Sequence, residues 1–152
     1  MTHGFVVLGL CSLLATGWVA AVTLDSVVSG MRGFNSDGFL ESETVEYVVG
    51  SIPGDQVFGN VPDGLWVAGL ANTRPLPIVY DPLSAEDNEA LDEEMSRLAD
   101  SIGDGAAVFY QLEGRDYMVD LSAVRAIAPC EIVADSTAIV LAGADHARCA
   151  GT

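Results

Sequence analysis

The chain has 152 residues, of which 22 are acidic and 6 are basic, and its formal net charge is −16. All six basic residues are arginines, and so few cations exclude a nucleic-acid-binding protein, because phosphate contacts need clustered Lys and Arg. In dilute buffer such a charge makes a compact domain repel itself, and concentrated salt screens the repulsion. The composition therefore predicts a protein of a halophile.

The first expected element is an apolar run over residues 5–24, FVVLGLCSLLATGWVAAVTL, which contains no charged residue. As a helix it would be about 30 Å long, which matches the hydrocarbon core of a bilayer. We therefore expect residues 1–30 to form a membrane-anchor helix. Small residues at spacings of three and four would form a helix-packing ridge within it, namely Gly9, Ser12, Thr16 and Ala20. The flanking charges leave the orientation open, with a slight preference for an extracytoplasmic domain.

Two other interpretations of this run stay open. The domain's own core or neighbouring chains of a large assembly would bury it equally well, because periodicity does not distinguish burial in lipid from burial in protein. A signal peptide cleaved after Ala21 is the third interpretation, although no basic residue precedes the run.

Residues 31–43 are expected to be a Gly-rich linker, and residues 44–152 an acidic, β-rich domain. The domain would open with a strand over 44–49, in which Val45, Tyr47 and Val49 share one buried face. Residues 51–64 are expected to form turns or a short hairpin, and GLWVAGL at 64–70 a central strand. The prolines of segment 73–82 confine any strand there to a sheet edge.

One amphipathic helix is predicted over about 84–102, with Ser84 as its N-cap and Gly103 as its stop. Its apolar stripe would pack on the sheet and consists of Leu91, Met95, Leu98 and Ile102. The acidic residues at 92–94 point in different directions around such a helix, so they indicate a solvated face rather than a metal site.

The pattern of the C-terminal third predicts a β unit. Strands over 106–112 and 116–120 would form a hairpin around 113–115, and further strands are expected over 123–128, 131–134 and 137–143. The predicted fold class is α+β, in which the apolar helix precedes a small, mainly antiparallel barrel or sandwich with one amphipathic helix.

Cys130 and Cys149 both lie in this last region, and a disulfide between them is expected if the domain is in an oxidising compartment. The sequence nominates no catalytic, cofactor-binding or metal-binding residue, and we expect no cofactor. Only His3 and His146 are available for a hydrolytic triad, and no motif places them with a nucleophile.

The sequence thus favours a non-catalytic, membrane-anchored accessory or structural interaction protein of a halophile, with protein partners or copies of itself in a larger assembly. The alternative is a soluble structural subunit of a virion or surface layer, whose apolar segment is buried by neighbouring chains. An enzyme that uses acidic residues of the turns is the least favoured class.

Overall fold

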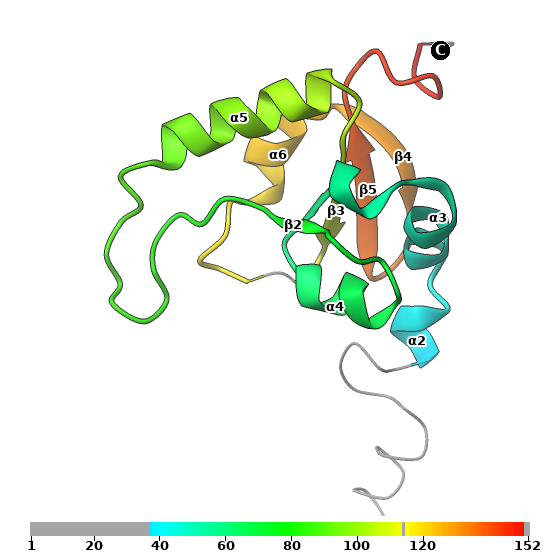
Figure 1. Ribbon diagram of the computed structural model, residues 1–152, viewed down its shortest axis with the longest axis horizontal. Coiled ribbons are helices and arrows are strands. Elements are labelled where there is room, and N and C mark those ends of the chain that lie inside the picture. Colours follow the sequence, from blue (N-terminus) through cyan, green and yellow to red (C-terminus); the bar gives the residue numbers. More distant parts are fainter. Residues whose placement is uncertain (1–36, 114, 151–152) are drawn as a thin grey trace, which may run out of the picture.

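The computed structural model describes residues 37–113 and 115–150, and its centre is an open, mixed sheet in the order β2-β1-β3-β5-β4 (Figure 1). The strands are β1 (Val57–Gly59), β2 (Arg74–Pro75), β3 (Ala107–Gln111), β4 (Cys130–Ala134) and β5 (Ala138–Ala142). The helices are α2 (Asp37–Leu40), α3 (Glu43–Ser51), the 3-10 turn η1 (Gly54–Gln56), α4 (Pro62–Val67), α5 (Leu91–Gly103) and α6 (Leu121–Ile127). The α+β class is confirmed, but the predicted barrel or sandwich is wrong.

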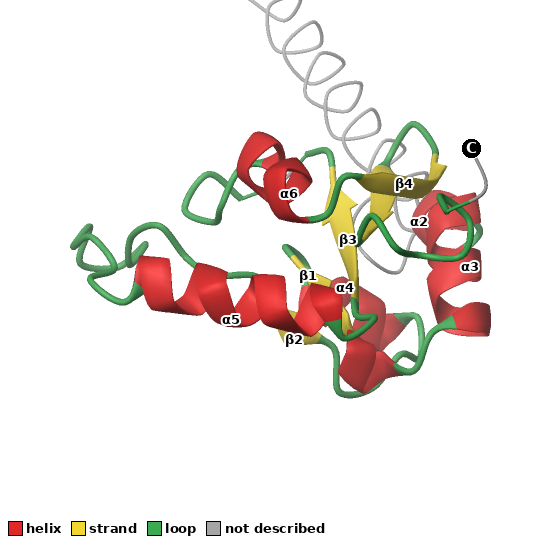
Figure 2. Ribbon diagram, turned by 90° about the horizontal axis from the view of Figure 1, so that it is seen from above, coloured by secondary structure: helices red, strands yellow, loops and turns green. Residues whose placement is uncertain are grey.

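Helices cover both faces of the sheet. Along β3, Ala107 and Phe109 belong to the core shared with α2, α3 and α4, whereas Val108 and Tyr110 belong to the core shared with α5 and α6. Figure 2 shows α5 and α6 on one side of the sheet and α2 and α3 on the other. Because successive strand residues point to opposite faces, the central strands β3 and β5 need apolar side chains on both faces, and β3 departs from this only at its last residue, Gln111. All five residues of β5 are accordingly buried.

The prolines protect one edge of the sheet. β2 pairs in parallel with β1, and the Leu76 N–H donates to the Gly59 carbonyl at 2.9 Å, so alternate N–H groups of this segment point toward β1. Pro75 and Pro77 take the positions that point away, where a proline sacrifices no ladder hydrogen bond. The prediction of an edge strand here is confirmed.

The C-terminal segment reinforces the opposite edge, at β4. A disulfide joins Cys130 at the start of β4 to Cys149, with 5.9 Å between their Cα atoms. Arg148 Nη1 donates to the Ile132 carbonyl at 3.3 Å, and its guanidinium lies 4.7 Å from the centroid of the Tyr47 ring on α3. The C-terminal segment is therefore tied to both the sheet edge and a helix.

The strand predicted over 44–49 is wrong, because this segment lies within α3. The Ser42 hydroxyl caps the helix by accepting from the Val45 N–H, and Val45 and Val48 are buried one helical turn apart. Their β-branched side chains favour strands, but burial of the helical stripe outweighs that preference.

The segment 51–70 departs from prediction in two places. Residues 51–64 contain the predicted turn, as η1, but no hairpin, because the following β1 lies between β2 and β3 in the sheet. The predicted central strand GLWVAGL overlaps α4, where Pro62 occupies the first turn without losing a helical hydrogen bond.

The amphipathic helix is confirmed but begins later than predicted. α5 starts at Leu91, and Ser84 lies in the preceding loop. Leu98 and Ile102 are buried, and Leu91 and Met95 pack against the same core, as the stripe predicted. The helix ends at Gly103 as expected.

The prediction for the C-terminal third is partly correct. The strands β3, β4 and β5 were predicted, and the turn at Asp135–Ser136 joins β4 to β5 in an antiparallel hairpin. Segment 116–120 forms no strand, so the predicted hairpin around 113–115 is wrong: β3 pairs with β5 instead. The predicted strand over 123–128 overlaps α6, which Asp120 caps by accepting from the Ala123 N–H at 2.8 Å.

The predicted anchor helix and its ridge of Gly9, Ser12, Thr16 and Ala20 lie outside the described residues. Phe39, inside the segment predicted as a linker, is buried in the core. Among residues 37–113 and 115–150, no helix combines the length and apolarity that a membrane span requires.

The Asp135 carboxylate joins the hairpin turn to α3. It accepts hydrogen bonds from the backbone and hydroxyl of both Thr44 and Thr137, and from the Ala138 N–H. Burial raises the pKa of Asp135, but the hydrogen bonds from Thr137 and Thr44 outweigh this effect and hold the pKa well below its usual range.

We expect Asp135→Asn to lower the free energy of unfolding by about 2 kcal/mol near neutral pH, as for the loss of charge-assisted hydrogen bonds. Because the folded-state pKa lies below the unfolded value of about 3.9, this contribution is complete above that value and is lost as the pH falls through the folded pKa. In urea titrations, the difference in unfolding free energy between the variant and the wild type should therefore shrink as the pH falls from about 5 toward about 2. Ser136→Ala, at the neighbouring exposed position, is the control. If the destabilisation by Asp135→Asn stays constant with pH, the ionised Asp135 carboxylate is not its source.

Candidate functional site

The cysteine, acidic and histidine side chains weighed in the sequence analysis do not converge on a reactive centre. Cys130 and Cys149 form the disulfide described above. Asp92 and Glu93 are exposed on α5, whereas the Glu94 carboxylate accepts from Asn88 Nδ2 at 2.9 Å. The His146 Nδ1 accepts from the Arg148 N–H at 3.3 Å. Within the described part of the chain, no group of three or more His, Cys, Asp or Glu side chains is placed to hold a metal ion.

The first candidate site is an apolar patch, formed by Leu40 at the end of α2, Val49 on α3, and Trp66 and Val67 on α4. Their exposed fractions are 37%, 39%, 55% and 49%. Leu40, Val49 and Val67 line one groove with a volume of about 650 Å³. Exposed apolar residues are ordinary when scattered, but a cluster around a groove indicates a docking surface.

Carboxylates border this apolar patch. Glu41 and Glu46 line the same groove, and both are exposed. In Figure 1, α2 and α4 lie next to each other at the end of the domain where the described chain begins. The groove is thus apolar, has an acidic rim, and adjoins the chain's entry into the domain.

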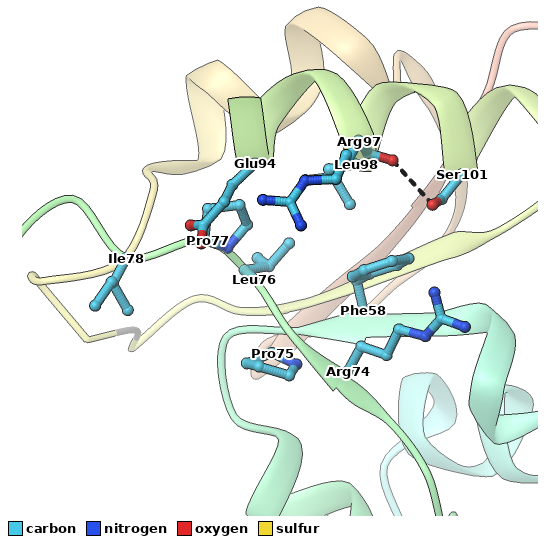
Figure 3. A pocket seen from close by; sticks show the side chains of 10 residues that line it. All are labelled: Phe58, Arg74, Pro75, Leu76, Pro77, Ile78, Glu94, Arg97, Leu98 and Ser101. Carbon is cyan, nitrogen blue, oxygen red and sulfur yellow. Dashed lines mark hydrogen bonds between the residues drawn. The ribbon is translucent and has the colours of Figure 1, made fainter. Parts of the chain in front are cut away.

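The second candidate site is a cavity between α5 and β2, with a volume of about 530 Å³. Its walls are largely apolar and include Phe58 of β1, Leu76 after β2, and Leu98 of α5. Two of the chain's six arginines, Arg74 and Arg97, also line it (Figure 3).

Sequence reasoning missed both sites for identifiable reasons. Val49 was assigned to the buried face of a strand, whereas the helical spacing of α3 turns it outward. Trp66 and Val67 were assigned to a central strand, and the signal for a helix was Pro62 followed by Asp63. The cavity joins residues from three separate segments, which no local pattern connects.

Comparison with known protein families, curated proteins and solved structures gives no match for this chain. Its function must therefore be inferred from the chemistry of these two surfaces.

Proposed function

We propose that this chain is a non-catalytic, membrane-anchored interaction protein of a halophile, and that its acidic domain binds a protein partner through the apolar patch. The observation that carries the proposal is one groove lined by the exposed side chains of Leu40, Val49 and Val67, beside the start of the domain. The exposed Trp66 precedes Val67 in the same helix and enlarges the exposed apolar surface of α4. Such a patch is energetically unfavourable in water, and its burial against a partner favours association.

The apolar run supports the membrane part of the proposal by limiting where the groove can lie. If residues 5–24 span the bilayer, the twelve residues 25–36 connect the span to α2. A fully extended chain of that length reaches about 40 Å. The groove is then held near the membrane surface, where tethering raises its effective concentration toward a partner in the same membrane.

The chemistry of the groove favours a protein over the lipid surface itself. Insertion of the patch into the headgroup region would bring Glu41 and Glu46 toward a medium in which a carboxylate loses hydration. A protein surface with apolar side chains and a basic rim covers the apolar groups and pairs the carboxylates at the same time. Trp66 supplies the large aromatic side chain that commonly contributes most of the binding energy at such interfaces.

The disulfide supports placement of the domain outside the cytoplasm. Structural disulfides persist in oxidising compartments and are rare in reducing ones. A domain on the outer side of the membrane, held by an N-terminal span, accommodates both the Cys130–Cys149 bond and the apolar run.

Photo-crosslinking tests the docking surface directly. A photoreactive amino acid at Val67 of the full-length chain, in native membranes at molar salt, should give a discrete protein adduct. The same group at Leu83, which is 96% exposed in the loop before α5, is the matched control and should give none. Adducts with lipid alone, or equal protein adducts from both positions, would contradict the proposal.

The loss of the patch should abolish that adduct without unfolding the domain. We expect Trp66→Ser to reduce crosslinking from position 67 by about tenfold or more, as for removal of an aromatic anchor. The unfolding free energy should change by less than about 1 kcal/mol, because more than half of the Trp66 surface is already exposed. A stable variant that still crosslinks fully would rule out the patch as the docking surface.

A further inference from the structure

We propose that the cavity between α5 and β2 is a binding site for a small organic anion with an apolar body, whose head group is a carboxylate or a phosphate. We call it the arginine-lined cavity and define it by Phe58, Arg74, Leu76, Glu94, Arg97 and Leu98. Its volume of about 530 Å³ lies in the range usual for small-molecule sites.

The apolar part of the cavity is preformed by the fold. Leu76 and Leu98 are almost completely buried and belong to the core between the sheet and α5. Phe58 packs against the same core from β1. Leu76 and Leu98 therefore support the partly exposed Phe58 from beneath, and the apolar body of a ligand would contact a ring that packing already holds in place, which lowers the entropic cost of binding.

Arg74 is the unusual feature of this site. The chain carries a net charge of −16, yet within the described residues no carboxylate forms an ion pair with Arg74. Its guanidinium instead lies 5.5 Å from the centroid of the Phe58 ring. A cation over an aromatic face is held by the ring while its N–H groups stay available, and the planar guanidinium matches a carboxylate or phosphate bidentately.

Arg97 supplies a second cation from α5. Figure 3 shows its guanidinium extending from the helix toward Leu76 and Pro77. Its ion pair with Glu93 is long, at 3.9 Å, and both side chains are mostly exposed, so the pair contributes little and yields readily to a ligand.

The acidic residue of the lining, Glu94, offsets only part of this positive charge. Its carboxylate accepts from Asn88 Nδ2 at 2.9 Å, which fixes its position but leaves its negative charge. Counting Arg74, Arg97 and Glu94, the lining is net positive on a strongly acidic domain. Because the lining combines positive charge with apolar side chains, we expect it to bind an anion with an apolar body more tightly than a neutral apolar compound.

Photoaffinity labelling of the full-length chain in lipid nanodiscs, in molar potassium chloride, tests the proposal. The probe is 4-benzoylbenzoate, and mass spectrometry maps the labelled peptides. We expect labelling within segments 74–78 and 94–101, and about tenfold less from the neutral analogue 4-benzoylbenzyl alcohol, as for loss of a charge-assisted contact. Equal labelling by the two probes, or labelling confined to other segments, would overturn the proposal.

Competition identifies the head group. Displacement of the probe by 3-phenylpropanoate or by phenyl phosphate supports the site and shows which anion it prefers. If neutral 3-phenylpropanol displaces the probe as well as these anions do, the cavity is only an apolar surface and the proposal fails.

Variants separate this site from a general charge effect. Arg74→Gln together with Arg97→Gln should reduce labelling by about tenfold or more. Arg125→Gln is the matched control, because Arg125 lies outside the cavity and forms an exposed ion pair with Glu131 at 3.3 Å. Labelling of this variant should stay within about twofold of wild type. Equal losses in both variants, with unchanged melting temperatures, would overturn the assignment.

Discussion

The melting temperature of the domain should rise by roughly 10 °C or more between dilute buffer and molar potassium chloride, measured on a chain from residue 25 onward that retains α2. The described residues hold three ion pairs, at Arg97–Glu93, Arg115–Asp63 and Arg125–Glu131, against a net charge of −16 for the chain. A like-charge pair at helical spacing costs about 0.2–0.5 kcal/mol, and the net charge adds repulsion across the whole domain. In molar salt the Debye length falls to about 3 Å and most of this repulsion is screened.

The end of α5 offers a variant that isolates the electrostatic part of this effect. Asp100 and Asp104 lie at the C-terminal end of the helix, where no basic residue offsets them and the helix dipole disfavours negative charge. Asp100→Asn with Asp104→Asn should stabilise the domain in dilute buffer by roughly 1 kcal/mol and should do so much less in molar salt. A wild-type melting temperature that is flat or falls with salt would contradict the halophile interpretation.

Removal of the disulfide is the second change expected to have a large effect. Cys130 and Cys149 are 19 residues apart, and closing a loop of that size stabilises a fold by about 3 kcal/mol by restricting the unfolded chain. Cys130→Ser with Cys149→Ser should therefore lower the melting temperature by roughly 10 °C. Wild-type protein in reductant should match the double variant, and reductant should leave the variant unchanged.

Alkylation provides the independent check of that bond. Under native, non-reducing conditions we expect Cys130 and Cys149 to resist alkylation, with the mass of the disulfide form. Cys11→Ser serves as the control, since this substitution removes a thiol outside the loop. Two freely alkylated thiols at 130 and 149, or a stability loss below about 1 kcal/mol, would contradict the role of the disulfide.

Elements whose burial pattern is local were predictable from the sequence. The stripe from Leu91 to Ile102 repeats with helical spacing and gives α5, and the apolar segments of β3 and β5 read as strands because both of their faces are covered. Pro75 restricted its strand to an edge for a purely chemical reason, the missing N–H group. In each case the local pattern and the tertiary environment favour the same structure.

Elements that depend on distant partners were not predictable. β1 is only three residues long and exists because β2 and β3 pair with it from segments far along the chain. In α3 the valines favour a strand locally, and the decisive signal was the N-cap at Ser42. The candidate sites were missed for the same reason, since Phe58, Arg74 and Arg97 meet only after the sheet has formed.

Fractionation of the full-length chain and of a chain lacking residues 1–24, expressed side by side at high salt, tests the central claim of a membrane-anchored domain most directly. We predict that the full-length chain sediments with membranes, resists extraction by salt and is released by detergent, because a span of about 20 apolar residues partitions into lipid. The shortened chain should be soluble, with the circular dichroism of an α+β domain and a cooperative melt. A full-length chain found in the soluble fraction, or a shortened chain that aggregates or fails to fold, would contradict the anchor and favour a segment buried by neighbouring subunits.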